Sequence, residues 1–533
     1  MKGSQFASGN VLVLLILLAV LFVPVILIQG SVLQYTNGIF IYPFDDTFIH
    51  MEIAKHLAEQ ATWGINDGEF GSASSSLLYT LILTLARFIS TSITVPFIIN
   101  CIAGFLLLLF AHKWLKRQQI SFVAQAIILS AAILLTPLAT LMISGMEHTL
   151  QTLLLFLFVF RFSDWLEKYL QGPTKSISPS ILLLAVALTL VRYESLFVIG
   201  MACLLLFLHK QFKAGLLLGF VALLPVLLFG MYSVSKGSFF MPNSVIVKAD
   251  SPDQLGLSGY INSVLTDKLV NAKTGLPALA TQRWLLVLPM LYLVFKKYMR
   301  PSYSFILLIL TGVTLLHLAL AATGWLYRYE AYLFFSAIVV TGLVLYKHGK
   351  DFLADKTFVT RLITALLLLF VFVPAVLRGL AALNKTKQAC INIYDQQYQM
   401  ARFSKQYYHN APLAINDIGA ISYFTDAKIV DLWGLATIDV TKSRKEKYWT
   451  PHFLDSLSKA NKAPVAMIYD VWFNDSLQNY WHKVASWQIQ NNIICGDDEV
   501  SFYALDSAHI PVLKQQLMQF QPKLPGTVTV RYF

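Results

Sequence analysis

Long apolar runs alternate with short polar segments from residue 11 to residue 380. The first run, residues 11–28, is long enough to cross the ~30 Å hydrocarbon core of a bilayer. Lys2 precedes it and no small-residue cleavage site follows, which indicates an uncleaved signal anchor with a cytoplasmic N-terminus. Ten further runs complete a prediction of eleven membrane-spanning helices, at about residues 94–112, 122–142, 149–163, 180–191, 195–208, 214–233, 283–295, 303–323, 329–346 and 360–380.

Lysine and arginine residues set the expected orientation of these helices. We interpret residues 77–89 as an interfacial helix, because this run is short and Arg87 interrupts it. Every large basic cluster then falls on one side, which the positive-inside rule assigns to the cytoplasm, and the C-terminus lies outside. The clusters are Lys113, Lys116 and Arg117; Lys168 and Lys175; Lys210 and Lys213; Lys296, Lys297 and Arg300; and Lys347, Lys350 and Lys356.

The composition agrees with a polytopic membrane protein. Of the 533 residues, 56% are hydrophobic and 13% are charged, whereas soluble proteins carry about 25% charged residues. This balance excludes a disordered chain, a small disulfide scaffold and an ordinary soluble enzyme. The net charge of +12 arises largely in the basic loops, so we expect no nucleic-acid partner.

The outside face is expected to carry three long segments, residues 29–93, 234–282 and 384–533. The last is large enough for a domain and contains strand-like runs between helix-permissive stretches, so it predicts an α/β domain after a transmembrane domain of residues 1–383. Cys390 and Cys495 both fall in it. Outside the cytoplasm they are able to form a disulfide, and two unpaired buried thiols are the alternative.

Two adjacent carboxylates, Asp45 and Asp46, open an amphipathic stretch in the first outside segment. We expect a helix along the membrane surface, with both aspartates at its N-terminus. One aspartate is able to cap this helix. The other is then available as a general base or as a ligand of a phosphate-bound divalent cation. The apolar face is predicted from Phe48, Ile49, Ile53, Ala54 and Leu57.

The sequence from Pro43 to Ser76 resembles the first extracytoplasmic loop of GT-C glycosyltransferases. The acidic pair is followed by Gly-x-Asn-x-Gly-Glu at Gly64–Glu69 and by a small-residue turn at Ser72–Ser75. The chain is similar to terminal arabinofuranosyltransferases of actinobacterial cell walls, and more distantly to protein O-mannosyltransferases and lipid A aminoarabinose transferases. Weaker likenesses follow at Ser144–Glu147, Arg192–Glu194, Pro242–Asn243 with Lys248, Arg328–Tyr329, Asn416–Ala420 and Val430–Leu435.

This resemblance implies a GT-C-like fold of about eleven transmembrane helices in a bacterial inner membrane, with the C-terminal domain in the periplasm or cell exterior. It also implies transfer of a sugar from a polyprenyl phosphate donor to an envelope glycan, lipid or protein acceptor. Asn243 belongs to one of the motifs, Tyr193 stands where proline is usual, and His148 stands where the relatives often carry threonine or a small residue.

A departing polyprenyl phosphate is anionic, and an Arg or Lys side chain stabilises such a charge in a site shielded from water. Glu147 and Glu194 lie at span ends and are either functional or ion-paired with a nearby arginine. Glu69 either closes the loop against the C-terminal domain or contacts the acceptor. The candidate phosphate-binding cations, each alternatively a snorkelling or headgroup-binding residue, are Arg192, Lys248, Arg283 and Arg328.

The expected mechanism is an inverting displacement at the anomeric carbon. Asp45 takes the proton of the acceptor hydroxyl, while Asp46 caps the helix and holds a divalent cation such as Mg²⁺, Mn²⁺ or Ca²⁺, and the reverse assignment stays open. A transporter or flippase for a lipid-linked glycan precursor is the alternative, although the charged residues are predicted at the outside mouth rather than the midplane. A non-catalytic envelope assembly or receptor protein is the third reading.

Overall fold

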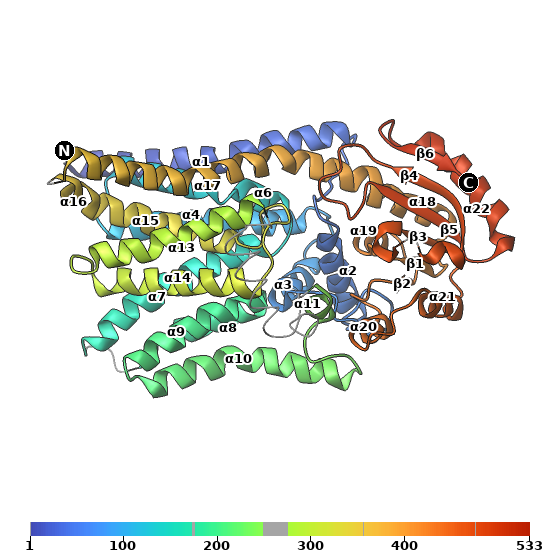
Figure 1. Ribbon diagram of the computed structural model, residues 1–533, viewed down its shortest axis with the longest axis horizontal. Coiled ribbons are helices and arrows are strands. Elements are labelled where there is room, and N and C mark those ends of the chain that lie inside the picture. The colour runs from blue at the N-terminus through green and yellow to red at the C-terminus, as the bar shows by residue number, and fades with distance from the viewer. Residues whose placement is uncertain (1, 173–175, 249–274, 355, 475) are drawn as a thin grey trace. The chain divides into compact units, whose positions relative to one another are not determined.

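The computed structural model describes residues 2–172, 176–248, 275–354, 356–474 and 476–533 (Figure 1). The chain divides into two compact units. Unit 1 comprises Met1–Ile28, Phe97–Leu227 and Asp250–Asn384, and unit 2 comprises Gln29–Pro96, Leu228–Ala249 and Lys385–Phe533. The first predicted outside segment and the C-terminal segment therefore belong to the same unit, although about 300 residues separate them along the chain.

The described secondary-structure elements of unit 1 are all helices. Three long helices, α1 (Lys2–Tyr35), α10 (Phe212–Ser235) and α17 (Phe358–Ile393), contribute residues to both units. The other helices of unit 1 are α4 (Val95–Arg117), α5 (Phe122–Leu135), α6 (Leu138–Ile143), α7 (His148–Leu170), α8 (Pro179–Val191), η1 (Tyr193–Ser195), α9 (Leu196–Leu208), α13 (Leu276–Phe295), α14 (Pro301–Leu320), α15 (Ala331–Val344), η3 (Leu345–Gly349) and α16 (Lys350–Ala354).

Eight helices among the described residues are long and apolar enough to cross a membrane. This finding confirms a helical protein with several helices of membrane-spanning length. Three of the eleven predicted spans are shorter apolar helices instead, at Phe122–Leu135, Pro179–Val191 and Tyr193–Leu208. Residues 122–142 do not form one continuous helix, because Pro137, with a φ of 24°, separates α5 from α6. A proline lacks the N–H that the helix would need to continue.

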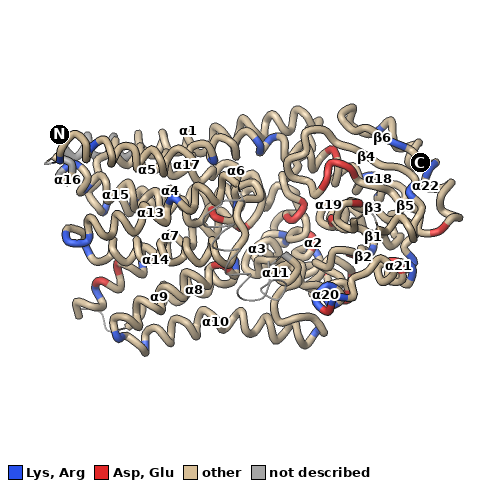
Figure 2. The backbone as a smooth tube through the Cα atoms, viewed as in Figure 1, with Lys and Arg blue, Asp and Glu red and all other residues tan. Residues whose placement is uncertain are grey.

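Turns rich in lysine and arginine meet at one end of unit 1. Tyr303, at the start of α14, donates its hydroxyl proton to Oε1 of Gln118, which follows α4, over 2.6 Å. The ammonium group of Lys347 lies 5.8 Å from the centre of the Tyr303 ring. Nη2 of Arg300 donates to Oε2 of Glu167, near the end of α7, over 2.8 Å. Figure 2 shows basic residues at the ends of these helices and few charges along their middles.

Unit 2 contains a six-stranded sheet in the order β2-β1-β3-β5-β4-β6, in which β2, β1 and β3 are parallel and the remaining pairs are antiparallel. Helices and strands alternate through the parallel part, as the α/β prediction for the C-terminal segment requires. The strands are β1 (Leu413–Ile415), β2 (Ile429–Asp431), β3 (Val465–Ile468), β4 (His482–Gln488), β5 (Glu499–Ala504) and β6 (Thr529–Tyr532). The helices are η4 (Tyr394–Tyr398), α18 (Gln399–Tyr407), α19 (Gly419–Phe424), α20 (Ile438–Lys445), α21 (Pro451–Ala460) and α22 (Ile510–Phe520), with short 3-10 turns at η5 (Asp470–Phe473), η6 (Ser476–Asn479), η7 (Ser507–His509) and η8 (Gln521–Lys523).

The first outside segment forms α2 (Asp45–Gln60) and α3 (Leu77–Arg87), and α11 (Asn243–Lys248) is a further short helix of unit 2. Helix α2 packs against both α3 and α19. Its polar residues Asp45, His50, Glu52 and His56 are buried along with its apolar face. The helix is therefore covered by protein on more than its apolar face, which its amphipathic pattern does not predict.

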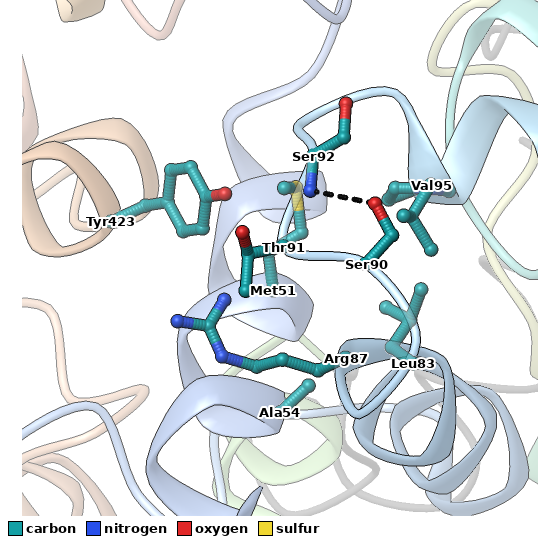
Figure 3. A pocket seen from close by; sticks show the side chains of 10 residues that line it. Met51, Ala54, Leu83, Arg87, Ser90, Thr91, Ser92, Val95 and Tyr423 are labelled. Carbon is teal, nitrogen blue, oxygen red and sulfur yellow. Dashed lines mark hydrogen bonds between the residues drawn. The ribbon is translucent and has the colours of Figure 1, made fainter. Parts of the chain in front are cut away.

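A small cavity lies where α2, α3 and α19 meet. It has a volume of about 20 Å³, and Figure 3 shows the guanidinium group of Arg87 turned toward Tyr423 across it. Nη2 of Arg87 also pairs with Oε1 of Glu59 at 2.6 Å. A space of this size holds about one water molecule, so this cavity is not a substrate site.

Candidate acidic site and buried charge cluster

The carboxylate of Asp45 is bound by backbone groups of the C-terminal part of unit 2. Its Oδ2 accepts the N–H of Gly419, and its Oδ1 accepts the N–H of Ala420 over 2.7 Å. These two amides begin α19, which follows β1. In parallel sheets, ligand-binding residues commonly lie on the loops at the carboxyl ends of the strands. A Cβ atom at position 419 would collide with the backbone oxygen of Asp45, so glycine permits this approach.

Asp417 lies beside Asp45 and is the main residue that the sequence prediction of the site left out. The two carboxyl groups share a hydrogen bond, and burial raises the pKa of both, with the charge of Asp417 raising that of Asp45 further. Two buried carboxylates in contact do not both ionise at neutral pH. Burial and the contact between the two carboxyl groups therefore favour the protonated form of one member of the pair.

Asp46 is half-buried, and its charge contributes to the raised pKa of Asp417. The prediction that Asp46 caps α2 is wrong: the N-cap residue is Phe44, and both aspartates lie within the first helical turn. Carboxylates in a first turn are favoured by the helix dipole without capping it. Within the ranges that the structure describes, no three His, Cys, Asp or Glu side chains are grouped to hold a metal ion, so the cation expected at Asp46 has no such set of ligands.

Asp417 accepts hydrogen bonds from two side chains of unit 2, and a third side chain supports one of these donors. Nε2 of Gln397 donates to Oδ2 of Asp417 over 2.7 Å, and the hydroxyl of Tyr469 donates to the same oxygen over 3.1 Å. The thiol of Cys495 donates to Oε1 of Gln397 over 3.3 Å. The disulfide considered for Cys390 and Cys495 is not formed: both are buried and free. Cys495 instead belongs to the network that orients Asp417.

A second cluster of charged residues is buried in unit 1. Arg192 lies between two carboxylates, with Nη1 2.7 Å from Oε1 of Glu147 and Nη2 2.6 Å from Oε1 of Glu194. The ion pair that the sequence left open for Glu194 is therefore formed, and Glu147 takes part in it as well. Arg192 precedes the turn η1, where the chain is extended at a φ of −162° between α8 and α9.

Tyr329 joins this ion-paired group to a second arginine. The guanidinium carbons of Arg192 and Arg328 lie 5.5 Å and 5.0 Å from the centre of its ring. Nη2 of Arg328 also donates to the Tyr329 hydroxyl over 3.2 Å. The ring of His148 is 5.9 Å from the same ring, and neither of its nitrogens has a hydrogen-bond partner among the described residues. Two of the four predicted phosphate-binding cations thus come together, with His148.

The other predicted residues lie elsewhere. In unit 1, Nη1 of Arg283 donates to the carbonyl of Phe370 over 2.6 Å, and its guanidinium carbon lies 3.9 Å from the centre of that ring. In unit 2, Lys248 is the last residue of α11. Asn243, at the start of the same helix, accepts a hydrogen bond from Ser238 over 3.2 Å.

Glu69 closes the first outside segment against the C-terminal part of unit 2. It forms an ion pair of 2.7 Å with Lys428. The neighbouring Asn66 accepts the backbone N–H of Ile429 over 2.8 Å and donates to its carbonyl oxygen over 2.9 Å. The turn at residues 64–69 is thereby held on the edge strand β2, and this outcome favours the first of the two roles considered for Glu69.

A fully buried ion pair in unit 1 was also missed. Nη2 of Arg378, in α17, lies 3.0 Å from Oε1 of Glu330, and it also donates to the carbonyl of Tyr327 over 2.7 Å. The signal was an arginine within the apolar run 360–380, since a charge inside such a run requires a partner.

Comparison with known proteins adds one finding for the C-terminal segment. A family model described as a domain of unknown function (DUF8728) matches residues 391–503. No curated protein matches the chain significantly. The matched segment contains Gln397, Asp417, Tyr469 and Cys495, so it includes the whole network around Asp417 but not Asp45.

Proposed function

We propose that the protein is a membrane glycosyltransferase that moves a sugar from a polyprenyl phosphate donor to an envelope glycan, lipid or protein acceptor. The observation that carries the proposal is the group of three carboxylates, Asp45, Asp46 and Asp417, in a chain whose described residues include eight helices of membrane-spanning length. A half-buried carboxylate beside a buried carboxyl pair of raised pKa is a general-base arrangement. Membrane-length helices suit a donor that is anchored in lipid.

We assign the general base to Asp46. Asp46 is half-buried, whereas Asp45 is buried and its oxygens accept two backbone N–H groups. In the proposed step, the acceptor hydroxyl oxygen forms a bond to the anomeric carbon while its proton passes to Asp46. The bond from that carbon to the phosphate oxygen breaks, and the phosphate leaves with the electron pair. The anomeric configuration is inverted.

In unit 1, we assign the binding of a phosphate group to Arg328. Arg192 is fixed by ion pairs with Glu147 and Glu194. Both arginines face Tyr329, and this shared contact supports a role for Arg192 in positioning Arg328. An arginine buried to 2% exposure stabilises an anion more strongly than one in water, because little solvent screens the charge.

We place the C-terminal domain outside the cytoplasm of a bacterial inner membrane. The basic turns after α4, α7, α13 and α15 meet at one end of unit 1. The positive-inside rule assigns that end to the cytoplasm. Sugars linked to polyprenyl phosphate are used at the opposite face.

Turnover by the full-length protein in nanodiscs tests the proposal. The assay supplies a panel of polyprenyl phosphate sugars with an envelope extract as acceptor and follows release of polyprenyl phosphate. We expect Asp46→Asn to lower release by about 10²–10⁴-fold, the usual contribution of a general base. Asp426→Asn is the control, since Asp426 is 63% exposed. Absence of release from every donor, or equal release by both variants, contradicts the proposal.

A transporter or flippase for a lipid-linked glycan precursor is the second candidate. The fully buried Arg378–Glu330 pair of unit 1 favours it, because ionisable residues inside apolar helices often line a transport path. Movement of intact lipid-linked sugar across proteoliposomes, with no release of polyprenyl phosphate, would support this candidate over the transferase.

A further inference from the structure

A groove of about 480 Å³ opens in unit 2, away from the residues of the acidic site. Its walls come from the turn at residues 65–71, from residues 236–237, from Lys428, and from α20 and α21 with the residues next to them. Its volume lies within the range of about 300–1,000 Å³ typical of ligand sites. None of its lining residues belongs to the network of Asp45 and Asp417.

The walls of the groove are fixed by contacts within unit 2. Asn66 exchanges two hydrogen bonds with the backbone of Ile429, which holds the turn at residues 64–69 on the sheet edge. A Cβ atom at Gly71 would lie 3.1 Å from the carbonyl oxygen of Ala436, so the two walls approach closely there. A binding site with walls held in this way loses little entropy when a ligand enters.

Three lysines from separate segments line the groove. Lys236 follows α10, Lys428 precedes β2, and Lys442 lies in α20. Lys428 is paired with Glu69, at 2.7 Å. The other carboxylate of the groove, Asp439, is exposed in α20. With three cations and two carboxylates, the groove carries one net positive charge.

Neutral polar groups and apolar side chains fill the space between these charges. The hydroxyl oxygen of Thr437 accepts the N–H of Asp431 over 3.0 Å, which leaves its own proton to donate. The amide nitrogen of Asn461 donates to the carbonyl of Leu457 over 3.0 Å, which leaves the amide oxygen as an acceptor. Phe70 and Leu457 supply apolar surface. Hydroxyl and amide groups beside apolar patches match the hydroxyl groups and C–H faces of sugar rings.

We infer that this groove binds a short oligosaccharide that carries an isolated negative charge, such as a uronic acid carboxylate, as the acceptor of the proposed transfer. The acceptor role rests on the proposed function, whereas binding itself does not. Carboxylates inside the groove repel a densely charged phosphate but accept sugar hydroxyls. Lys236 and Lys442, on separate segments, attract the isolated charge.

Binding of two trisaccharides to the full-length protein tests the inference. The protein is placed in phosphatidylcholine nanodiscs without donor, and calorimetry compares trigalacturonate with neutral maltotriose. We expect trigalacturonate to bind at least tenfold more tightly at 50 mM salt, with the difference shrinking at 200 mM. The Lys236→Ala/Lys442→Ala double variant should lose the difference, and the corresponding double arginine variant should keep it. Lys405→Ala, an exposed position on α18, is the control.

The inference is overturned if the wild type binds the two trisaccharides with equal affinity. It is also overturned if the double alanine variant, with an unchanged melting temperature, still prefers trigalacturonate as the wild type does. A second result also overturns the inference. In it, the wild type binds phosphatidylglycerol vesicles but not trigalacturonate, and the double alanine variant no longer binds the vesicles. This result assigns the lysines to a lipid headgroup. Asp46→Asn should bind trigalacturonate as the wild type does. If the wild type releases polyprenyl phosphate but does not bind trigalacturonate, this inference fails and the proposed function stands. If it binds trigalacturonate but releases no polyprenyl phosphate, the proposed function fails and the binding site stands.

Discussion

Substitution of Gly419 by alanine should move α19 away from the N-terminus of α2. A Cβ atom there would lie 2.7 Å from Oδ2 of Asp45 and even closer to its backbone oxygen. Real Cβ atoms do not tolerate such contacts with backbone, so the hydrogen bonds from Gly419 and Ala420 to the carboxylate must lengthen or break. A hydrogen bond to a charged group contributes roughly 1.5–3 kcal/mol. Taking the lower value for each of the two hydrogen bonds gives an expected loss of about 3 kcal/mol.

Scanning fluorimetry of the full-length protein in nanodiscs measures this effect. For units of this size, 1 kcal/mol corresponds to about 2–4 °C, so the expected fall in Tm is about 6–12 °C. Hydrogen exchange gives a local readout, because the amides of residues 419 and 420 should exchange faster once Asp45 withdraws. Gly526→Ala is the matched control, since a Cβ atom at Gly526 meets nothing within 4 Å.

The reasoning is refuted if Gly419→Ala melts within about 1 °C of Gly526→Ala and its amides keep their protection. Release of polyprenyl phosphate provides a second measure. We expect it to fall in Gly419→Ala, because Asp46 follows Asp45 in the chain and moves with it. If Gly419→Ala keeps both full stability and full turnover, the contact between Asp45 and α19 does not position Asp46.

Two further predictions concern the same unit. Burial raises the pKa of Glu52 from 4.5 to about 7 despite the nearby Lys55, so its stabilisation is complete below about pH 4.5 and is lost as the pH rises through 7. At 1.36 kcal/mol per pKa unit this amounts to roughly 3 kcal/mol. The Tm of Glu52→Gln relative to wild type should therefore rise between pH 5 and pH 8, and a constant difference would contradict the assignment. Asn66→Ala removes both hydrogen bonds to Ile429 and should lower the free energy of unfolding by about 1–3 kcal/mol. Its Tm should therefore be lower than that of the control Asn479→Ala, which changes an exposed residue. Equal melting temperatures would show that the turn does not depend on Asn66.

Local patterns of the sequence predicted the helices, the α/β segment and half of the acidic site. Asp45 and Asp46 attract attention because two carboxylates open a helical stretch. Asp417 is equally visible as a polar residue two positions after a buried strand, but nothing local indicates that it meets Asp45. The hydrogen bond from Gly419 to Asp45 joins residues 374 positions apart. A local pattern carries no information about which distant segment will fill the space beside it.

The surroundings of α2 are the clearest difference between prediction and structure. Its apolar spacing is typical of a helix with one buried face, yet His50 and Glu52 are only 2% exposed. Ser74 contacts Nδ1 of His50 at 3.1 Å, and Lys55 donates to Glu52 over 3.1 Å. Polar residues are tolerated inside a protein when they have such partners. Their burial therefore depends on neighbours that the hydrophobic pattern does not describe.

The sequence by itself determined that this chain forms apolar helices of membrane-spanning length and an α/β segment, because hydrophobic periodicity acts over a few turns or strands. The tertiary structure alone decided that Asp45 and Asp417 share a site, that Arg192 and Arg328 face one tyrosine, and that the two thiols stay apart. These outcomes depend on long-range packing, in which the cost of burying each charge is met by partners supplied from elsewhere in the chain.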